Sequence, residues 1–174
     1  MVAGDQQNPV LVELTAELKD KFLAMAEDYR SAGEDRYQLG LDDFAGFLKH
    51  LEMYATGEGL SAESVRSNMF LLLAEDKLIG SGNLRHQLNA GLAVMGGHIG
   101  YNVRPSERQK GYGSLILKLT LEKAREIGLE RVFLTCDTDN IASVKIIEKH
   151  GGRLENQIIY EKTGKLISQY WIEL

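Results

Sequence analysis

Two cations and two glycines stand close together between an apolar segment and a long helical pattern. They are Arg108, Lys110, Gly111 and Gly113. Glycine lets backbone N–H groups approach a ligand, and the first turn of a helix carries a partial positive charge. Exposed N–H groups and nearby cations together favour an anion, most often a phosphate. The stretch therefore predicts a phosphate-binding loop at the start of a helix.

The spacing of these glycines separates the loop from two common phosphate-binding motifs. A P-loop requires GxxxxGK followed by Ser or Thr, and the chain contains no such string. A dinucleotide-binding turn requires GxGxxG, but Ile116 stands where its third glycine would be. The sequence therefore argues against a P-loop nucleotidase and against a dinucleotide oxidoreductase.

Apolar periodicity on both sides of the loop predicts the elements that position it. We expect helices at 15–33, 41–57, 115–127 and 140–149, and strands at 10–14, 68–75, 77–85, 97–103, 131–137, 158–160 and 166–172. Gly80 and Gly82 inside one strand indicate a bulge or a close backbone contact. No repeat or linker interrupts the pattern, so we expect one domain over residues 1–174. The order predicts an α/β (α+β) fold, with a mixed, mostly antiparallel central sheet of about seven strands flanked by helices.

The composition limits the partners and compartments that we expect. With 20 basic and 25 acidic residues the formal net charge is −5, unlike the basic surface of a nucleic-acid binder. There is one cysteine and no cluster of His, Cys and carboxylates at metal-binding spacing, so we expect no intramolecular disulfide and no metal. Met1–Pro9 lacks the apolar core of a signal peptide, and no apolar run approaches the roughly 18 residues that span a membrane. We therefore expect a cytoplasmic protein without membrane or nucleic-acid partners.

The loop and its surroundings resemble one enzyme family. Arg108-x-x-Gly111-x-Gly113 resembles the R/Q-x-x-G-x-G/A acetyl-CoA loop of the GNAT superfamily of N-acetyltransferases. Val103-Arg104-Pro105 resembles the end of that family's central strand, and Asn140 with Ser143 resembles its later N-x-x-S element. The order of elements also matches over essentially the whole chain. Within the superfamily, the run GHIGYNVRPSERQKGYG is similar to a group of bacterial predicted acetyltransferases.

The resemblance implies an acetyl-CoA-dependent N-acetyltransferase. The acetyl group would move to a primary amine by direct attack, and the acceptor would be a small molecule, a lysine side chain or an N-terminal amine. A homodimer would be in keeping with the superfamily. The residues that the resemblance implies for acetyl-CoA binding are Asn102, Val103, Arg108, Gln109, Lys110, Gly111, Tyr112, Gly113, Ser114, Asn140 and Ser143.

The sequence departs from the family where the leaving thiolate is often protonated. That acid is often a Tyr seven residues after the Asn, and here the position holds Ile147. The open candidates are Tyr101, Tyr160 and Tyr170, and we place Tyr101 in the predicted catalytic set. The vacant position also leaves a second hypothesis, a non-catalytic module that binds or senses acyl-CoA.

His98 is the predicted general base. It stands on the central strand where relatives often carry a Glu, on the same face as Gly100 and Asn102. An imidazole titrates near working pH, which suits removal of a proton from an amine. The alternative is a histidine that bonds to the backbone within the sheet.

Several other residues allow two interpretations. Arg85 and His86 end a strand near the expected acceptor site, where they could bind an acidic group of the substrate or be solvated. Asp137 and Asp139 follow a strand, where they could bind a cationic amine or serve as turn and capping residues. Cys136 lies in an apolar strand, which favours a core residue over a nucleophile.

The early helices carry acidic residues that bear on the acceptor. They include Glu27, Asp28, Glu34, Asp35 and Asp42. An acidic rim would favour a cationic acceptor such as a polyamine, although a solvated helix face has the same composition.

Overall fold

A computed structural model describes residues 8–174 of the chain. The expectation about Met1–Pro9 therefore falls almost entirely outside the described residues. The strands are β1 (Val10–Glu13), β2 (Ser67–Ala74), β3 (Lys77–Arg85), β4 (Ile99–Val103), β5 (Arg131–Asp137), β6 (Arg153–Tyr160) and β7 (Lys165–Glu173). The helices are η1 (Ala16–Leu18), α1 (Lys19–Ser31), α2 (Gln38–Asp42), α3 (Phe44–Thr56), η2 (Pro105–Glu107), α4 (Tyr112–Glu126) and α5 (Ile141–Lys149).

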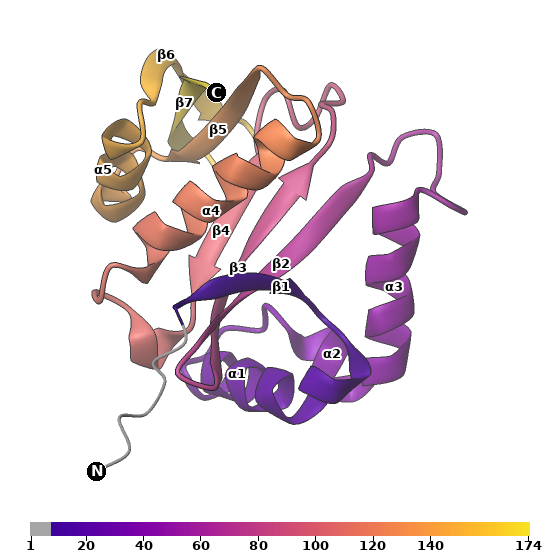
Figure 1. Ribbon diagram of the computed structural model, residues 1–174. Coiled ribbons are helices and arrows are strands. Elements are labelled where there is room, and N and C mark those ends of the chain that lie inside the picture. The colour runs from indigo at the N-terminus through magenta and orange to yellow at the C-terminus, as the bar shows by residue number, and fades with distance from the viewer. Residues whose placement is uncertain (1–7) are drawn as a thin grey trace.

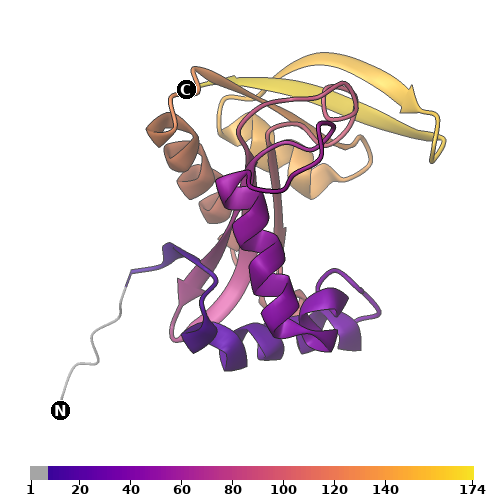
Figure 2. The ribbon, with the colours of Figure 1, turned by 90° about the vertical axis from the view of Figure 1, so that its right-hand side faces the viewer.

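Helices cover both faces of an antiparallel sheet, as the sequence predicted (Figure 1). The order β1-β2-β3-β4 forms this sheet. On one face, α1 packs Phe22, Met25 and Tyr29 against Leu71 and Leu78. On the other face α4 packs against β3 and β4, which places its first turn beside the end of β4. Turned by a quarter, the molecule shows α3 crossing the face opposite α4 (Figure 2).

The predicted fold class and the number of seven strands were confirmed, but the strands form two sheets instead of one central sheet. The strands β5-β7-β6 form a second antiparallel sheet. The two sheets meet at the start of β4, where the His98 N–H donates to Phe133 O over 2.7 Å. The Phe133 N–H then donates to the His98 ring Nδ1 over 2.9 Å, instead of to a backbone carbonyl. A side chain thus ends the pairing, and beyond it β4 and β5 separate.

Two smaller differences have local causes. The predicted helix at 41–57 is divided, because the Asp43 side chain accepts the Gly46 N–H over 2.9 Å and starts α3 anew. Strand β6 begins at Arg153 instead of 158. Its first five residues are exposed, so they lack the apolar alternation by which a strand is recognised in a sequence.

The prediction for the glycines of β3 was confirmed. The register between β2 and β3 shifts at Leu72/Leu73, opposite Gly80. A Cβ on Gly80 would collide with the Asn102 carbonyl oxygen, and one on Gly82 would collide with the Thr120 hydroxyl. Both glycines therefore let α4 and β4 lie close to β3.

Within residues 8–174, no helix is long and apolar enough to cross a membrane.

Candidate active site

The predicted anion loop joins β4 to α4 and exposes a row of backbone donors. Gln109 has φ 64° and Gly111 has φ 86°, so two left-handed residues turn the chain just before α4. In the described part of the chain, no hydrogen bond uses the N–H groups of residues 109–114. Consecutive free N–H groups at a helix N-terminus form an anion site of the kind that holds a pyrophosphate.

The two glycines of the loop serve different purposes. At Gly111 an added Cβ would meet no atom within 4 Å, so its left-handed φ of 86° is what favours glycine. At Gly113 an added Cβ would lie 3.1 Å from Ile146 Cδ1 and 3.7 Å from Val103 Cγ2. Gly113 therefore lets the first turn of α4 lie close to β4 and α5.

An ionic anchor fixes the loop against α1. Arg104 Nε lies 2.8 Å from Asp28 Oδ2, and the Ser106 hydroxyl donates to the same oxygen over 2.6 Å. Burial acts to raise the pKa of Asp28, but the hydrogen bonds from Arg104 and Ser106 outweigh it and hold the pKa below its ordinary value. Asp28 is thus a charged anchor of the loop, which is a role that the sequence did not distinguish from a solvated helix face.

Both cations of the loop are already paired with carboxylates. Arg108 Nη2 lies 2.7 Å from Glu34, and its Nε donates to Val103 O over 3.1 Å. Lys110 Nζ lies 2.7 Å from Glu107. All four side chains reach solvent, so a phosphate can compete for the cations at modest cost.

The edge of β4 continues this donor surface. On either side of β4, the His98 carbonyl oxygen accepts the Arg85 N–H and the Arg104 N–H donates to Ile79 O, so the His98 carbonyl and the Arg104 N–H face β3. In an antiparallel pair the orientation alternates, which turns the N–H groups of Tyr101 and Val103 toward β5. By the same alternation the backbone N–H of Asn102 faces β3, so of the two predicted acetyl-CoA residues on this strand only Val103 turns its N–H into the gap, and the role of Asn102 stays a prediction.

The side chain of Asn102 belongs to a polar network on the α1 face of the sheet. Its Oδ1 accepts the hydroxyls of Tyr29 and of Tyr37, the latter over 3.0 Å. Its Nδ2 donates to Ser81 Oγ over 2.9 Å, and the hydroxyl oxygens of Ser81 and Tyr37 lie 2.9 Å apart. The four residues stand far apart in the sequence without a common spacing, so sequence reasoning missed the network.

A cavity of about 270 Å³ opens where β4 and β5 separate. Its lining residues come from β4, β5 and the start of α5, and they are Ile99, Gly100, Tyr101, Leu134, Thr135, Cys136, Asp137, Asn140, Ser143 and Ile147. The predicted donor-site residues Asn140 and Ser143 thus lie beside β4. Asn140 is the N-cap of α5, because its Oδ1 accepts the Ser143 N–H over 3.1 Å.

Of the three tyrosines left open, Tyr101 is the one that lines this cavity. Its hydroxyl lies 3.5 Å from the Ser143 carbonyl oxygen, at the limit of a hydrogen bond. Burial raises the pKa of Tyr101 to about 12, so the phenol stays protonated at neutral pH. Ile147 lines the same cavity, which brings Tyr101 close to the position where the family often has its acid.

Two other cavity residues match the interpretation that excludes catalysis. Burial raises the pKa of the Cys136 thiol to about 11, which keeps it from being a thiolate nucleophile. Asp137 pairs with Lys165, and Asp137 O accepts the Asn140 N–H in the turn before α5.

Ser114 of the anion loop bonds through its hydroxyl to His150 Nε2 over 2.9 Å, which links α4 to the end of α5.

His98 lies at the junction of the two sheets and has 8 % of its surface exposed. Its Nδ1 accepts the Phe133 N–H, so in the neutral ring the proton is on Nε2. Burial, with the nearby Arg85 as a smaller cause, lowers the pKa of His98. In this tautomer Nε2 already carries the proton and the lone pair of Nδ1 is occupied by the Phe133 N–H, which favours a structural bond to the backbone of β5 over the predicted role as base.

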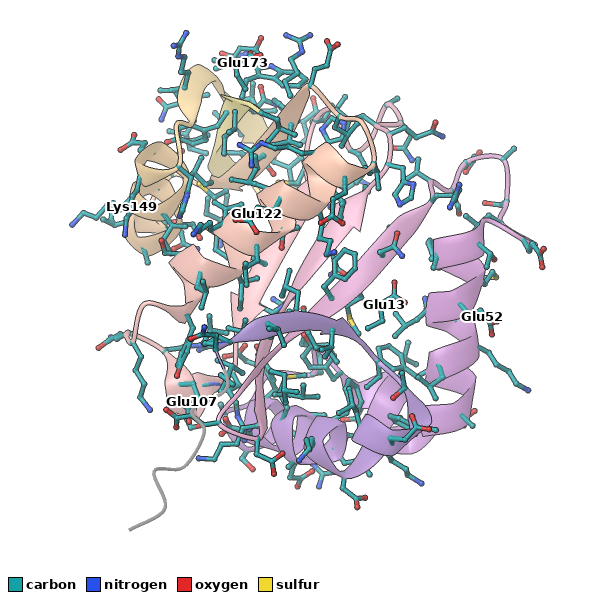
Figure 3. The ribbon with its side chains drawn as sticks, in the orientation of Figure 1. Glu13, Glu52, Glu107, Glu122, Lys149 and Glu173 are labelled. Atoms are coloured by element: carbon teal, nitrogen blue, oxygen red, sulfur yellow. The ribbon has the colours of Figure 1, made fainter. Side chains whose placement is uncertain are left out.

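Two further pockets lie between α3 and the sheet. One, of about 330 Å³, is lined by His50, Leu51, Tyr54, Ser67, Met69, Asn83 and Arg85. The other, of about 410 Å³, shares Leu51 and Met69 with it and includes the carboxylates of Glu13 and Glu52. Figure 3 shows Glu13 at the end of β1 and Glu52 on α3.

In residues 8–174 no group of three or more His, Cys, Asp or Glu residues is placed to hold a metal ion.

Solved structures with the same architecture are acetyltransferases. RimL, a ribosomal L7/L12 alpha-N-protein acetyltransferase in complex with coenzyme A, has a TM-score of 0.72 at 14% identity, covering 97% of this chain and 95% of that one. The microcin C7 self-immunity acetyltransferase MccE, in complex with acetyl-CoA and AMP, has a TM-score of 0.72 at 13% identity, with 98% and 93% covered. A GNAT-family acetyltransferase from Streptococcus pneumoniae has a TM-score of 0.64 at 19% identity, with 96% and 99% covered. At these identities the likeness concerns the fold.

No curated protein sequence matches the chain. The sequence model of the family described as acetyltransferase (GNAT) domain, however, matches residues 11–153. The match includes β4, the anion loop, α4 and the N-cap of α5. The chain therefore belongs to the GNAT acetyltransferase family, whose acetyl donor is acetyl-CoA.

Proposed function

We propose that this enzyme transfers an acetyl group from acetyl-CoA to a primary amine of a small molecule or a peptide. One observation carries the proposal: the free N–H groups of residues 109–114 continue into the open edge of β4 and its cavity. This path offers donors for a pyrophosphate at one end and for a thioester carbonyl at the other. RimL acts on a protein N-terminus, so such acceptors occur on this fold.

The residues of the path have distinct proposed roles. Gln109 to Ser114 hold the pyrophosphate through their N–H groups, while Arg108 and Lys110 add charge after exchanging their carboxylate partners. Val103 pairs with the pantetheine arm as an added strand would, and Asn140 and Ser143 border that arm. Bound acetyl-CoA supplies the thioester that the amine attacks directly.

Tyr101 is the proposed general acid. Its N–H faces the gap between β4 and β5, and its hydroxyl lies at the wall of the cavity. With a pKa of about 12 the phenol holds its proton until a thiolate leaves and then donates it. In this proposal Tyr101 on β4 donates the proton that Ile147, at the family's usual acid position on α5, cannot donate.

We propose that the acceptor ammonium loses its proton to solvent before it attacks. His98 remains the predicted alternative, but its Nδ1 must first release the Phe133 N–H. The two routes differ in the effect of His98→Ala on the pH dependence of kcat/KM. Loss of a pH-dependent limb would favour His98, and an unchanged profile would favour solvent.

The function is tested with a panel of amines and a free-thiol readout. We expect thiol release that requires both acetyl-CoA and an amine, with acetylated amine appearing in equal amount. Ile147 also motivates a second function, a non-catalytic acyl-CoA sensor. Tight acetyl-CoA binding without thiol release across primary amines, amino acids and peptides would support the sensor and overturn the enzyme assignment.

We further propose that residues 1–174 act as one domain in the cytoplasm. The expected homodimer can be checked by measuring the mass of the protein in solution. Two observations support one domain: His98, just before β4, bonds to Phe133 of β5, and α4 packs against the first sheet and α5.

A further inference from the structure

The pocket of about 330 Å³ beneath α3 contains a positive charge without a negative partner. Arg85 is half-buried there, and no ion pair within residues 8–174 involves it. Burial lowers the pKa of Arg85, but a guanidinium remains charged at neutral pH. A charge that is partly withdrawn from water usually has a counter-ion, and no carboxylate of the described chain supplies one for Arg85.

Part of the guanidinium is fixed and part is free. Arg85 Nη1 donates to the carbonyl oxygens of Gly96 and Gly97 over 3.2 Å and 3.0 Å. These bonds hold the guanidinium plane in place. In the described part of the chain, Nε and Nη2 make no hydrogen bond, so they can form a two-pronged contact with a carboxylate or a phosphate.

Other side chains of the pocket are also without partners. Across residues 8–174, no hydrogen bond uses the side chains of His50, Tyr54, Ser67 or Asn83. They come from α3, β2 and β3 and line one pocket. Hydroxyl, amide and imidazole groups that converge on a pocket beside a buried cation are typical of a site for a small polar ligand.

The pocket borders the cavity in which the acetyl group would react. Arg85 Nη1 lies 4.0 Å from the position that a Cβ on Gly100 would occupy. Gly100 itself lines the cavity between β4 and β5. With only a glycine between them, a molecule anchored at Arg85 can present an amine to the cavity.

We propose that this pocket binds the acceptor, and that Arg85 selects acceptors that carry a carboxylate or a phosphate near the reactive amine. The proposal rests on the proposed function, since it names the acceptor class of that enzyme. It reverses the expectation from the acidic helices, because Glu27, Asp28 and Glu34 are paired with arginines and none of them lines this pocket.

The test compares matched amines that differ in one negative charge. The pairs are an amino acid with its amide, O-phosphoethanolamine with ethanolamine, and a tripeptide amide whose third residue is aspartate with its asparagine form. Rates of thiol release and binding to the CoA-loaded enzyme are measured for each pair. We expect the charged member of at least one pair to have a kcat/KM at least about tenfold higher, as a hydrogen-bonded charge typically gives. The pair that responds identifies carboxylate, phosphate or peptide as the source of the anion.

Variants at Arg85 assign the preference to this side chain. Arg85→Gln should abolish the difference between charged and neutral members by raising KM, and Arg85→Lys should keep part of it. Arg66→Gln is the matched control, because the Arg66 guanidinium also bonds to a backbone carbonyl, that of Ala55 in the last turn of α3, but does not line the pocket. Equal rates for both members of every pair, or a preference that survives Arg85→Gln, would overturn this proposal while leaving the acetyltransferase assignment intact. Absence of both binding and thiol release for every amine would overturn both.

Discussion

The anion loop between β4 and α4 and the pocket beneath α3 are built from different parts of the chain. In the loop, the ligand-facing groups are backbone N–H groups of the consecutive residues 109–114. In the pocket the proposed ligand-facing groups are side chains from α3, β2 and β3, among them Arg85. A backbone site depends on glycine conformation and on close packing, whereas a side-chain site depends on the residues themselves. The donor can therefore be inferred from a short local motif, while the acceptor requires the folded structure.

The largest effect is expected at Tyr101, where the loop path meets the cavity. Tyr101→Phe removes the proposed acid, so kcat should fall by about a hundredfold, as loss of a general acid typically does. KM for acetyl-CoA should change little, because the backbone N–H remains. Because burial raises the pKa of Tyr101 to about 12, kcat should show no descending limb from this group below about pH 11. Steady-state rates across pH 6 to 10 check both statements, and full kcat in Tyr101→Phe would remove this residue from the mechanism.

Packing at Gly113 tests the backbone site next. In Gly113→Val the Cβ alone would lie 3.1 Å from Ile146 Cδ1, and the two methyl groups need further space. Overpacking of this kind typically costs about 1–3 kcal/mol. If that cost falls on the bound loop geometry, we expect KM for acetyl-CoA to rise at least about fivefold. Lys118→Val, at an exposed position of the same helix, is the control and should leave KM unchanged. A Gly113→Val enzyme with normal KM would mean that the loop does not hold the donor.

A substitution at His98 tests whether this residue stabilises the junction of the two sheets. His98→Ala leaves the Phe133 N–H without its acceptor, so the free energy of unfolding should fall by about 1–3 kcal/mol. Burial lowers the pKa of His98 in the folded state, so the unfolded chain binds the proton more tightly. This histidine therefore contributes stability above about pH 6.5, and the contribution is lost as the pH falls toward its lower folded pKa. Chemical denaturation of wild type and His98→Ala between pH 5 and 8 measures the difference, and a constant difference across that range would contradict the assignment.

The smallest effect is expected at Glu34. Glu34→Gln releases Arg108 from its surface ion pair, which typically is worth about 0.2–1 kcal/mol. Affinity for acetyl-CoA should therefore increase by at most about fivefold, because Arg108 no longer exchanges partners. Glu126→Gln, which breaks the exposed pair with Lys123 on α4, should have no such effect. Weaker acetyl-CoA binding by Glu34→Gln would show that the pair positions Arg108 for the ligand.

The same contrast explains which features could be predicted from the sequence. The spacing of Arg108, Gly111 and Gly113 is local, and each glycine has the conformation or close contact that the spacing implies. The order of strands and helices also follows from local periodicity. The division of the seven strands into two sheets could not be predicted, because it occurs where one ring nitrogen of His98 takes the place of a backbone acceptor, which periodicity cannot reveal.

The Asn102 network and the pocket beneath α3 depend on contacts between residues that are distant in the sequence. Asn102 joins Tyr29, Tyr37 and Ser81, and their positions have no common spacing. Arg85 could be interpreted as a solvated strand end because its burial arises from the loop that returns at Gly96 and Gly97. Its lack of a counter-ion is visible only once every nearby carboxylate has been placed.

Calorimetric titration with acetyl-CoA tests most directly whether donor and acceptor sites are separate. We predict one-to-one binding by the wild-type enzyme, binding at least about fivefold weaker in Gly113→Val, and unchanged binding in Arg85→Gln. Wild-type affinity in Gly113→Val, or loss of acetyl-CoA binding in Arg85→Gln, would contradict the account.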